Sequence, residues 1–197
     1  MPKVVDADQY RKELLYQSLD LFAEKGFANV TIRQIAKALG ISTGALYHYF
    51  PSKESLFEQL VEELGHQEVL VLNSAMATRK TLPKRIEILG QLLLENREIL
   101  VKHTAIWLDF YQHSQVETIL NNRIFQRIER QSREAIAELL GIRDFRLARF
   151  ISVSIDGILV DQLGKNDSTI FAEQVALLME MLITYFDKYP EKSSLNS

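Results

Sequence analysis

The chain has 197 residues, of which 47% are hydrophobic, so it can bury the core of one or two domains. It contains no cysteine, which excludes disulfides and zinc fingers with cysteine ligands, and its formal net charge is -3. The N-terminus has no apolar signal-peptide core, and no run approaches the roughly 18 uncharged apolar residues that suggest a membrane span. We therefore expect a soluble cytoplasmic protein with no membrane partner.

The first predicted helix runs from about residue 8 to residue 25, because leucines and Phe22 recur there at helical spacing. A second helix begins after Thr31. The Thr31 hydroxyl can accept from the exposed backbone donors of this helix, and Gln34 three residues later completes a capping box. An apolar stripe then predicts a buried face for this short helix.

A glycine turn and a third short helix follow. Gly40 comes where the backbone at a helix end commonly adopts positive φ. Ser42 or Thr43 can cap the next helix, and Pro51 ends it by restricting the residue before it. Two short helices joined by a glycine turn, with apolar residues on their inner sides, predict a helix-turn-helix.

The charge of residues 25–53 suits a DNA-binding surface, whereas the charge of residues 1–65 as a whole does not. Residues 1–65 contain 7 basic and 9 acidic side chains. From Lys25 to Lys53, however, the basic residues are Lys25, Arg33, Lys37 and Lys53, and no acidic residue occurs. The predicted motif therefore presents phosphates with a locally positive surface.

The rest of the chain predicts further helices and no strand. Ser52 can cap a long fourth helix, and Pro83 suits the first turn of the next one. Helical periodicity then continues to residue 188, with breaks at Gly141 and before Ser168. The expected helices cover residues 83–95, 98–113, 116–140, 144–164 and 168–188, so the predicted fold class is all-α.

Residues 10–60 resemble the N-terminal domain of the TetR family of bacterial transcriptional regulators. The matching stretches are LFAEKGFANVTIRQIAKALGIS and TGALYHYFPSKESLF. The resemblance implies a three-helix DNA-binding domain over residues 1–52. It also implies a helical ligand-binding and dimerisation domain over residues 53–197, which a linking helix at about 53–78 begins.

The resemblance also assigns candidate DNA contacts. Lys53 matches a position that commonly meets a phosphate in the family, and Thr31 can combine capping with a phosphate contact. Ser42, Thr43 and Gly44 open the helix that approaches the bases. For Arg33 a solvated side chain is the alternative, and for Tyr49 it is a partly buried ring. The full candidate set is Thr31, Arg33, Ser42, Thr43, Gly44, Tyr47, His48, Tyr49 and Lys53.

An aromatic stripe marks the middle of the chain. His103, Trp107, Phe110 and Tyr111 are three or four residues apart and therefore share one helix face. Because the resembling family usually buries its effector between the middle helices, they are candidate pocket residues, with Phe125 and Ile128 as an opposite wall. Packing in an ordinary core is the alternative for each of them.

The last two predicted helices carry apolar surface that suits a dimer interface, formed as a four-helix bundle across a two-fold axis. An intramolecular core is the alternative. Asp156 and Asp161 lie among these apolar residues and need a partner, for which Arg146, Arg149 or a cationic effector are candidates. The candidate interface residues are Ile151, Ile155, Ile158, Val175, Leu178 and Leu182.

The C-terminal two-thirds contains no phosphate-binding loop, nucleophile elbow or zinc-binding HExxH motif. We therefore expect no enzyme activity, no metal and no cofactor. The leading hypothesis is a homodimeric repressor that binds an inverted-repeat operator in double-stranded DNA and is released by a small molecule. The alternatives are a regulator whose C-terminal domain recognises another protein, and an enzyme that retains a helix-turn-helix.

Overall fold

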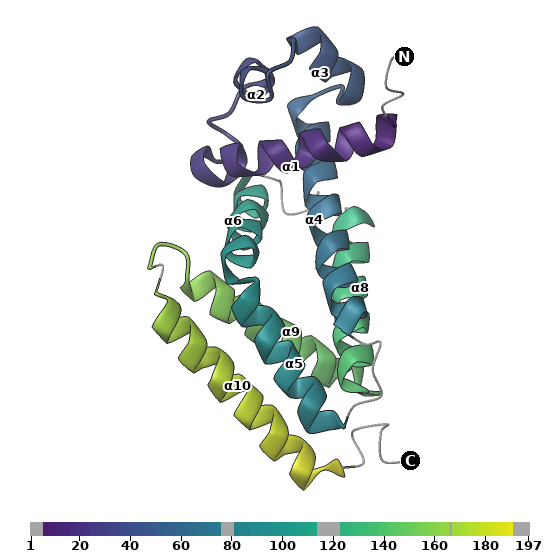
Figure 1. The fold of residues 1–197 in the computed structure, drawn as a ribbon, viewed down its shortest axis with the longest axis vertical. Helices are drawn as coiled ribbons and strands as arrows, with labels where there is room; N and C mark the ends of the chain where they lie inside the picture. Colours follow the sequence, from purple (N-terminus) through teal and green to yellow (C-terminus); the bar gives the residue numbers. More distant parts are fainter. Residues whose placement is uncertain (1–5, 76–80, 114–122, 166, 191–197) are drawn as a thin grey trace. The chain divides into compact units, whose positions relative to one another are not determined.

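The computed structural model describes residues 6–75, 81–113, 123–165 and 167–190, which contain nine helices and no strand (Figure 1). The predicted all-α fold class is confirmed. The expected start of one helix at residue 116 lies outside the described residues. The helices are α1 (Ala7–Lys25), α2 (Ile32–Ala38), α3 (Thr43–Tyr49), α4 (Lys53–Ala75), α5 (Leu82–Glu95), α6 (Arg97–His113), α8 (Arg123–Leu140), α9 (Phe145–Asp161) and α10 (Ser168–Lys188).

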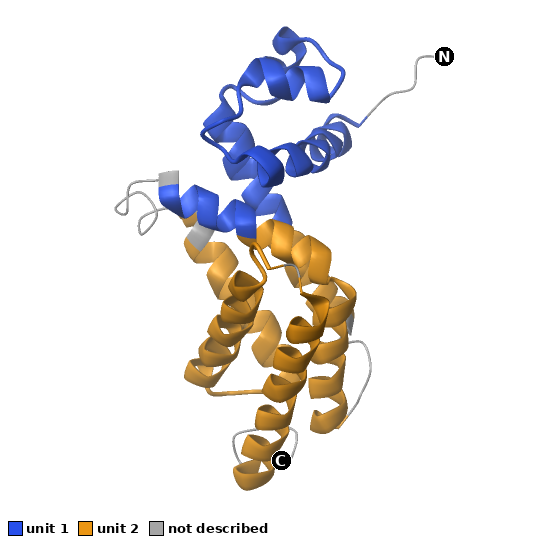
Figure 2. Ribbon diagram, turned by 90° about the vertical axis from the view of Figure 1, so that its left-hand side faces the viewer, with its two compact units in different colours: residues 1–64, 105–122 blue, residues 65–104, 123–197 orange. Residues whose placement is uncertain are grey.

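The chain divides into two compact units (Figure 2). Unit 1 contains residues 1–64 and 105–122, and unit 2 contains residues 65–104 and 123–197. The division therefore falls inside α4 and inside α6. The predicted boundary between residues 52 and 53 coincides with the start of α4, directly after the helix-turn-helix motif.

Unit 1 packs α1, α2 and α3 around an apolar core. Leu14, Leu15, Leu19 and Phe22 of α1 are buried, as their spacing predicts. The aromatic rings of the unit continue this core. Phe22 meets Phe57 edge-on with ring centroids 5.0 Å apart, and Phe57 stacks on Phe110 of α6 at 5.7 Å. Such ring pairs add to the free energy gained from apolar burial.

Unit 2 has its own core, built from one face of each of its longer helices. Ile86 and Leu89 of α5 are buried together with residues of α8, α9 and α10. Gly65 explains how α8 approaches α4 so closely, because a Cβ added there would lie 2.5 Å from Ile128 Cγ2. The residues of α10 that are buried in this core are Phe171, Val175, Leu178, Met179, Leu182 and Phe186.

Helix α10 is long and apolar enough to cross a membrane, with a mean hydropathy of 1.4 in its most apolar stretch, and no other helix in the described ranges meets both conditions. The core helix of a soluble protein can have the same length and composition. Six residues of α10 are buried against the unit 2 core.

Candidate nucleic-acid interface

A capping box fixes the start of α2. The backbone N–H of Gln34 donates to Thr31 Oγ1 at 3.3 Å, and the backbone N–H of Thr31 donates to Gln34 Oε1 at 2.8 Å. These bonds satisfy donors that a helix N-terminus leaves without an intrahelical acceptor. The predicted capping box is therefore confirmed.

The turn between α2 and α3 is fixed by its backbone and by a second cap. Gly40 has a φ of +67°, in the left-handed region that glycine adopts without strain. The N–H of Ile41 donates to the Ala36 carbonyl at 3.0 Å. Ser42 Oγ accepts from the Ala45 N–H at 3.1 Å, so Ser42 caps α3 and Thr43 is its first residue. The predicted helix-turn-helix is present.

The outer surface of α2 and α3 is polar, whereas their inner surface is apolar. Ile35 and Leu46 are fully buried, and Tyr47 keeps 52% of its surface exposed. No acidic residue lies between Glu24 and Glu54 in the sequence, so none interrupts this surface from within the motif. The exposed candidate contacts here are Thr31, Arg33, Ser42, Gly44, Tyr47 and His48, and Thr43 is half-buried.

Gly44 lies on this surface without a packing reason to be glycine. Beyond its own helix backbone and chain neighbours, the atom nearest to an added Cβ is Ser42 Oγ, at an ordinary distance of 3.9 Å. Its φ lies outside the left-handed region. The missing side chain leaves open space on the outside of α3, where an approaching duplex can come close to the backbone.

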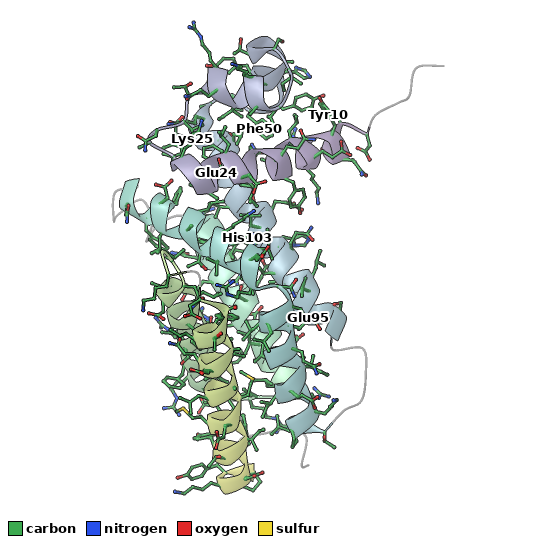
Figure 3. All side chains as sticks on the ribbon, turned by 60° about the vertical axis from the view of Figure 1, so that its left-hand side comes forward. Tyr10, Glu24, Lys25, Phe50, Glu95 and His103 are labelled. Carbon is green, nitrogen blue, oxygen red and sulfur yellow. The ribbon has the colours of Figure 1, made fainter. Side chains whose placement is uncertain are left out.

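Tyr49 is oriented by other aromatic rings. Its ring packs edge-on against Tyr10 of α1 at 5.4 Å and against His48 at 5.3 Å. Figure 3 shows Tyr10 together with Phe50, the residue that ends α3. Tyr49 is half-buried, which agrees with the alternative of a partly packed ring.

Lys53 is engaged within unit 1. Its Nζ donates to the Phe27 carbonyl at 2.7 Å and lies 4.0 Å from the centroid of the Phe27 ring. On the other side of the same residue, the Phe27 N–H donates to a carboxylate oxygen of Asp109. Side chains from α4 and α6 thus hold the turn between α1 and α2. An ammonium group has three donors, so Lys53 can still meet a phosphate.

The predicted pocket residues are divided between the two compact units. Phe110 is buried in the unit 1 core, where it stacks on Phe57, so core packing explains it. Trp107 stacks on the exposed Tyr111 at 6.3 Å, also within unit 1. His103 belongs to unit 2. The Phe125 side chain lies outside the described residues, and the buried Ile128 lies against Gly65.

His103 is buried, with 5% of its surface exposed, and Figure 3 shows it on α6. Its Nδ1 lies 2.7 Å from a carboxylate oxygen of Glu68 on α4. Because a carboxylate accepts, Nδ1 carries the proton of this hydrogen bond. The buried Nε2 has no hydrogen-bond partner among the described residues. Sequence reasoning missed Glu68, since one glutamate on a charged helix gives no signal of a buried partner.

Asp156 and Asp161 have different surroundings. Partial burial of the Asp156 carboxyl raises its pKa to about 6, and the nearby charges of Glu68 and Glu129 contribute. Asp161 is half-buried and pairs with Lys165, whose hydrogen bond lowers the pKa of this carboxyl. Arg146 pairs with Asp144 instead. Neither Arg146 nor Arg149 forms an ion pair with Asp156 among the described residues.

The predicted interface residues all contribute to the core of unit 2. Ile151, Ile155, Val175, Leu178 and Leu182 are buried within the unit 2 core, and Ile158 packs against it. A side chain that its own chain already covers has almost no surface left for a second chain. The exposed large apolar residues of the same two helices form a different set, namely Phe145, Phe150, Val153 and Val160 on α9 and Ile170, Leu177, Met181 and Ile183 on α10.

Three comparisons with known proteins bear on this arrangement. A family model described as "Bacterial regulatory proteins, tetR family" matches residues 14–60. The nucleoid occlusion factor SlmA of Aliivibrio fischeri is 32% identical over 137 residues, which cover 65% of this chain and 67% of SlmA. The HTH-type transcriptional regulator BetI of Brucella anthropi is 27% identical over 190 residues, covering 92% and 96% of the two chains.

Solved structures share the fold at low sequence identity. The transcriptional regulator FadR of Bacillus subtilis, in complex with stearoyl-CoA, has a TM-score of 0.68 at 19% identity and covers 87% of this chain and 96% of its own. A putative transcriptional regulator from Saccharomonospora viridis, in complex with choline, has a TM-score of 0.65 at 23% identity, with coverages of 91% and 96%.

The fold and the α2–α3 surface define a helix-turn-helix regulator with an additional helical domain. The family model and the relatives agree with this class. The chain belongs to the TetR family of bacterial transcriptional regulators. It is a transcription factor and not an enzyme.

Proposed function

We propose that this chain is a ligand-responsive repressor that binds an inverted-repeat operator as a homodimer in the cytoplasm. The observation that carries the proposal is the exposed surface of α2 and α3, which has polar and basic side chains and no acidic residue between Glu24 and Glu54. Two such surfaces, related by a two-fold axis, would enter successive major grooves about 34–36 Å apart.

Within this proposal the DNA contacts are divided by role. Thr31, Arg33 and Lys53 meet phosphates, which supply affinity that falls with salt concentration. Ser42, Thr43, Gly44, Tyr47 and His48 face the bases, where sequence is read. Tyr49 supports this surface from its partly buried position.

The second copy is proposed to dock on α9 and α10. Phe150, Val153 and Val160 recur at helical spacing on α9, and Leu177 and Met181 do so on α10. Phe150, Val153 and Leu177 are each 58% exposed, which is unusual for large apolar side chains on a surface that water covers. Pairing two helices from each copy buries these residues in a four-helix bundle.

The proposed effector is a small molecule bound in unit 2. Two proteins of similar fold are solved with small molecules, stearoyl-CoA in one and choline in the other. Residues of α4 belong to both units, so this helix is the proposed mechanical link. An effector that favours the DNA-incompetent arrangement lowers operator affinity, and operator DNA lowers effector affinity by the same factor.

Selection of bound sequences from a random pool of duplex DNA tests the proposal. Purified full-length protein at one stated salt concentration should enrich an inverted repeat. Enrichment of a single half-site would contradict the dimer, and enrichment of no sequence by a folded, ligand-free protein would contradict specific DNA binding. If the C-terminal region instead recognises a protein, no small molecule will release the enriched operator.

A further inference from the structure

Four helices of unit 2 bring acidic and imidazole groups near one another. We call this set the Asp156 cluster: Glu68 on α4, His103 on α6, Glu129 on α8 and Asp156 on α9. Glu68 is hydrogen-bonded to His103, and both Glu68 and Glu129 lie close enough to Asp156 for their charges to affect it. The members are up to 88 positions apart in the chain (156 minus 68), so only the fold unites them.

The packing of α4 against α8 explains part of this arrangement. Gly65 lets α8 approach closely at Ile128. Glu68 lies one helical turn after Gly65, and Glu129 directly follows Ile128. The close approach at Gly65 and Ile128 therefore places the two helix segments that carry Glu68 and Glu129 beside each other.

Within the ranges that the structure describes, two of the three carboxylates of the cluster have a basic partner. Arg133 pairs with Glu129 at 3.0 Å, and His103 is bonded to Glu68. Asp156 has neither a hydrogen bond nor an ion pair with any residue that the structure describes. Three carboxylates thus face one guanidinium and one imidazole, and the net charge is negative whether or not the imidazole is protonated.

A buried atom without a partner points to a missing ligand, and the surroundings of Asp156 agree with it. Part of the Asp156 residue is exposed, and partial burial of its carboxyl group disfavours the charged form. His103 Nε2 is buried and without a partner, although its ring is fixed beside Glu68. A buried polar atom without a partner costs free energy, so a ligand that satisfies it gains affinity.

We propose that the Asp156 cluster binds the positively charged end of the effector, an organic amine or quaternary ammonium compound. Asp156 and Glu68 supply the opposing charge, and His103 Nε2 binds a polar group of the same molecule. An anionic effector such as an acyl-CoA would meet carboxylates of like charge. The inference rests on the proposed effector site in unit 2 and names the chemical class of its ligand.

Paired cationic and neutral compounds test the charge requirement on the full-length chain. Choline is compared with its neutral isostere 3,3-dimethylbutan-1-ol, and benzyltrimethylammonium with neopentylbenzene, by thermal shift and titration calorimetry. Spermidine and stearoyl-CoA complete the set. At least one cation should raise the Tm more than a neutral compound does at equal concentration. Equal effects of cations and neutral isosteres, or stabilisation by stearoyl-CoA alone, would overturn the proposal.

Variants of the cluster then test which residues bind the cation. Asp156→Asn and Glu68→Gln keep the side-chain shapes, and each should weaken binding of the cation at least tenfold. Glu173→Gln is the matched control, because Glu173 is an exposed carboxylate on α10 outside the cluster, and it should bind like the parent. Circular dichroism confirms the fold of each variant. Unchanged cation binding in both cluster variants would contradict the assignment.

Operator binding is measured separately with the same ligands. If a cation binds the cluster and operator affinity does not change, the inference stands and regulation by this ligand fails. If stearoyl-CoA releases the operator while no cation binds, the inference fails and the proposed ligand-responsive function stands. The two failures are thus distinguishable.

Discussion

Gly44 lies second in α3, where neither a neighbouring side chain nor the backbone requires glycine. Because alanine favours helix by up to about 1 kcal/mol, Gly44→Ala should fold normally and leave the Tm unchanged or slightly higher. The added methyl group points to the side from which DNA is proposed to approach. Operator affinity should therefore fall about tenfold, roughly 1.4 kcal/mol. Parent-like binding in a gel-shift titration would remove Gly44 from the contact set.

Lys53 is predicted to serve both folding and DNA binding. Lys53→Ala removes the donor to the Phe27 carbonyl and should lower the free energy of unfolding by about 1 kcal/mol. If Lys53 also meets a phosphate, the slope of log K against log salt should decrease by about 1. Lys53→Arg keeps the charge and serves as the control. A stability loss with an unchanged slope would confine Lys53 to a structural role.

The Asp156 carboxyl predicts a pH dependence of stability. Its pKa rises from an ordinary value of 3.8 to about 6, so the folded chain holds this proton more tightly than the unfolded chain does. The free energy of unfolding therefore falls as pH rises between these values, and the ionised group destabilises the fold above about pH 6. Asp156→Asn should raise the Tm at pH 7.5 but not below about pH 4.

Asp161→Asn is the control, because the pKa of the Asp161 carboxyl is shifted in the opposite direction. Its partner Lys165 lowers this pKa. Asp161→Asn should not raise the Tm at pH 7.5. An equal Tm for the parent and Asp156→Asn at both pH values would mean that the Asp156 carboxyl is fully hydrated in solution.

At the scale of helices, the start of α2 depends on a single side chain. Thr31→Ala removes one half of the capping box and should cost about 1 kcal/mol, measured as a lower midpoint of urea unfolding. Thr31→Ser keeps the hydroxyl and should restore most of the loss. Equal midpoints for all three proteins would show that the cap contributes nothing.

Most helices could be predicted because their signals are local. Ser52 Oγ accepts from the Ser55 N–H at 3.0 Å and caps α4, as its sequence position indicates. The bond between Asp109 and the Phe27 N–H gave no such signal, because its partners are 82 residues apart. Helical periodicity identifies an apolar face but not the chain that covers it. Ile151 and Leu178 were therefore predicted as interface residues although they lie in the core.

At the scale of the whole molecule, the exposed apolar residues of α9 and α10 predict where a second copy of the chain binds. Leu177 and Met181 are 58% and 54% exposed, so changing both to glutamate should leave the chain folded. Burying two such charges in a dimer is costly, and the double variant should sediment as a monomer and lose cooperative operator binding. Leu94→Glu, at an exposed leucine on α5, is the control and should remain dimeric. A dimeric double variant would place the interface elsewhere.

Most helices and the helix-turn-helix motif follow from the sequence, because caps, glycine turns and apolar spacing act over a few residues. The family follows from the resemblance of residues 10–60 to the TetR family. The sequence also indicated which side of α3 faces outward. The fold was needed to see that Lys53 and Asp109 hold the turn at Phe27 and that Glu68 is hydrogen-bonded to His103. It was also needed to see which apolar side chains of α9 and α10 stay exposed. Those relations join residues far apart in the chain, and their energies depend on distance, burial and charge, which spacing along a sequence does not contain.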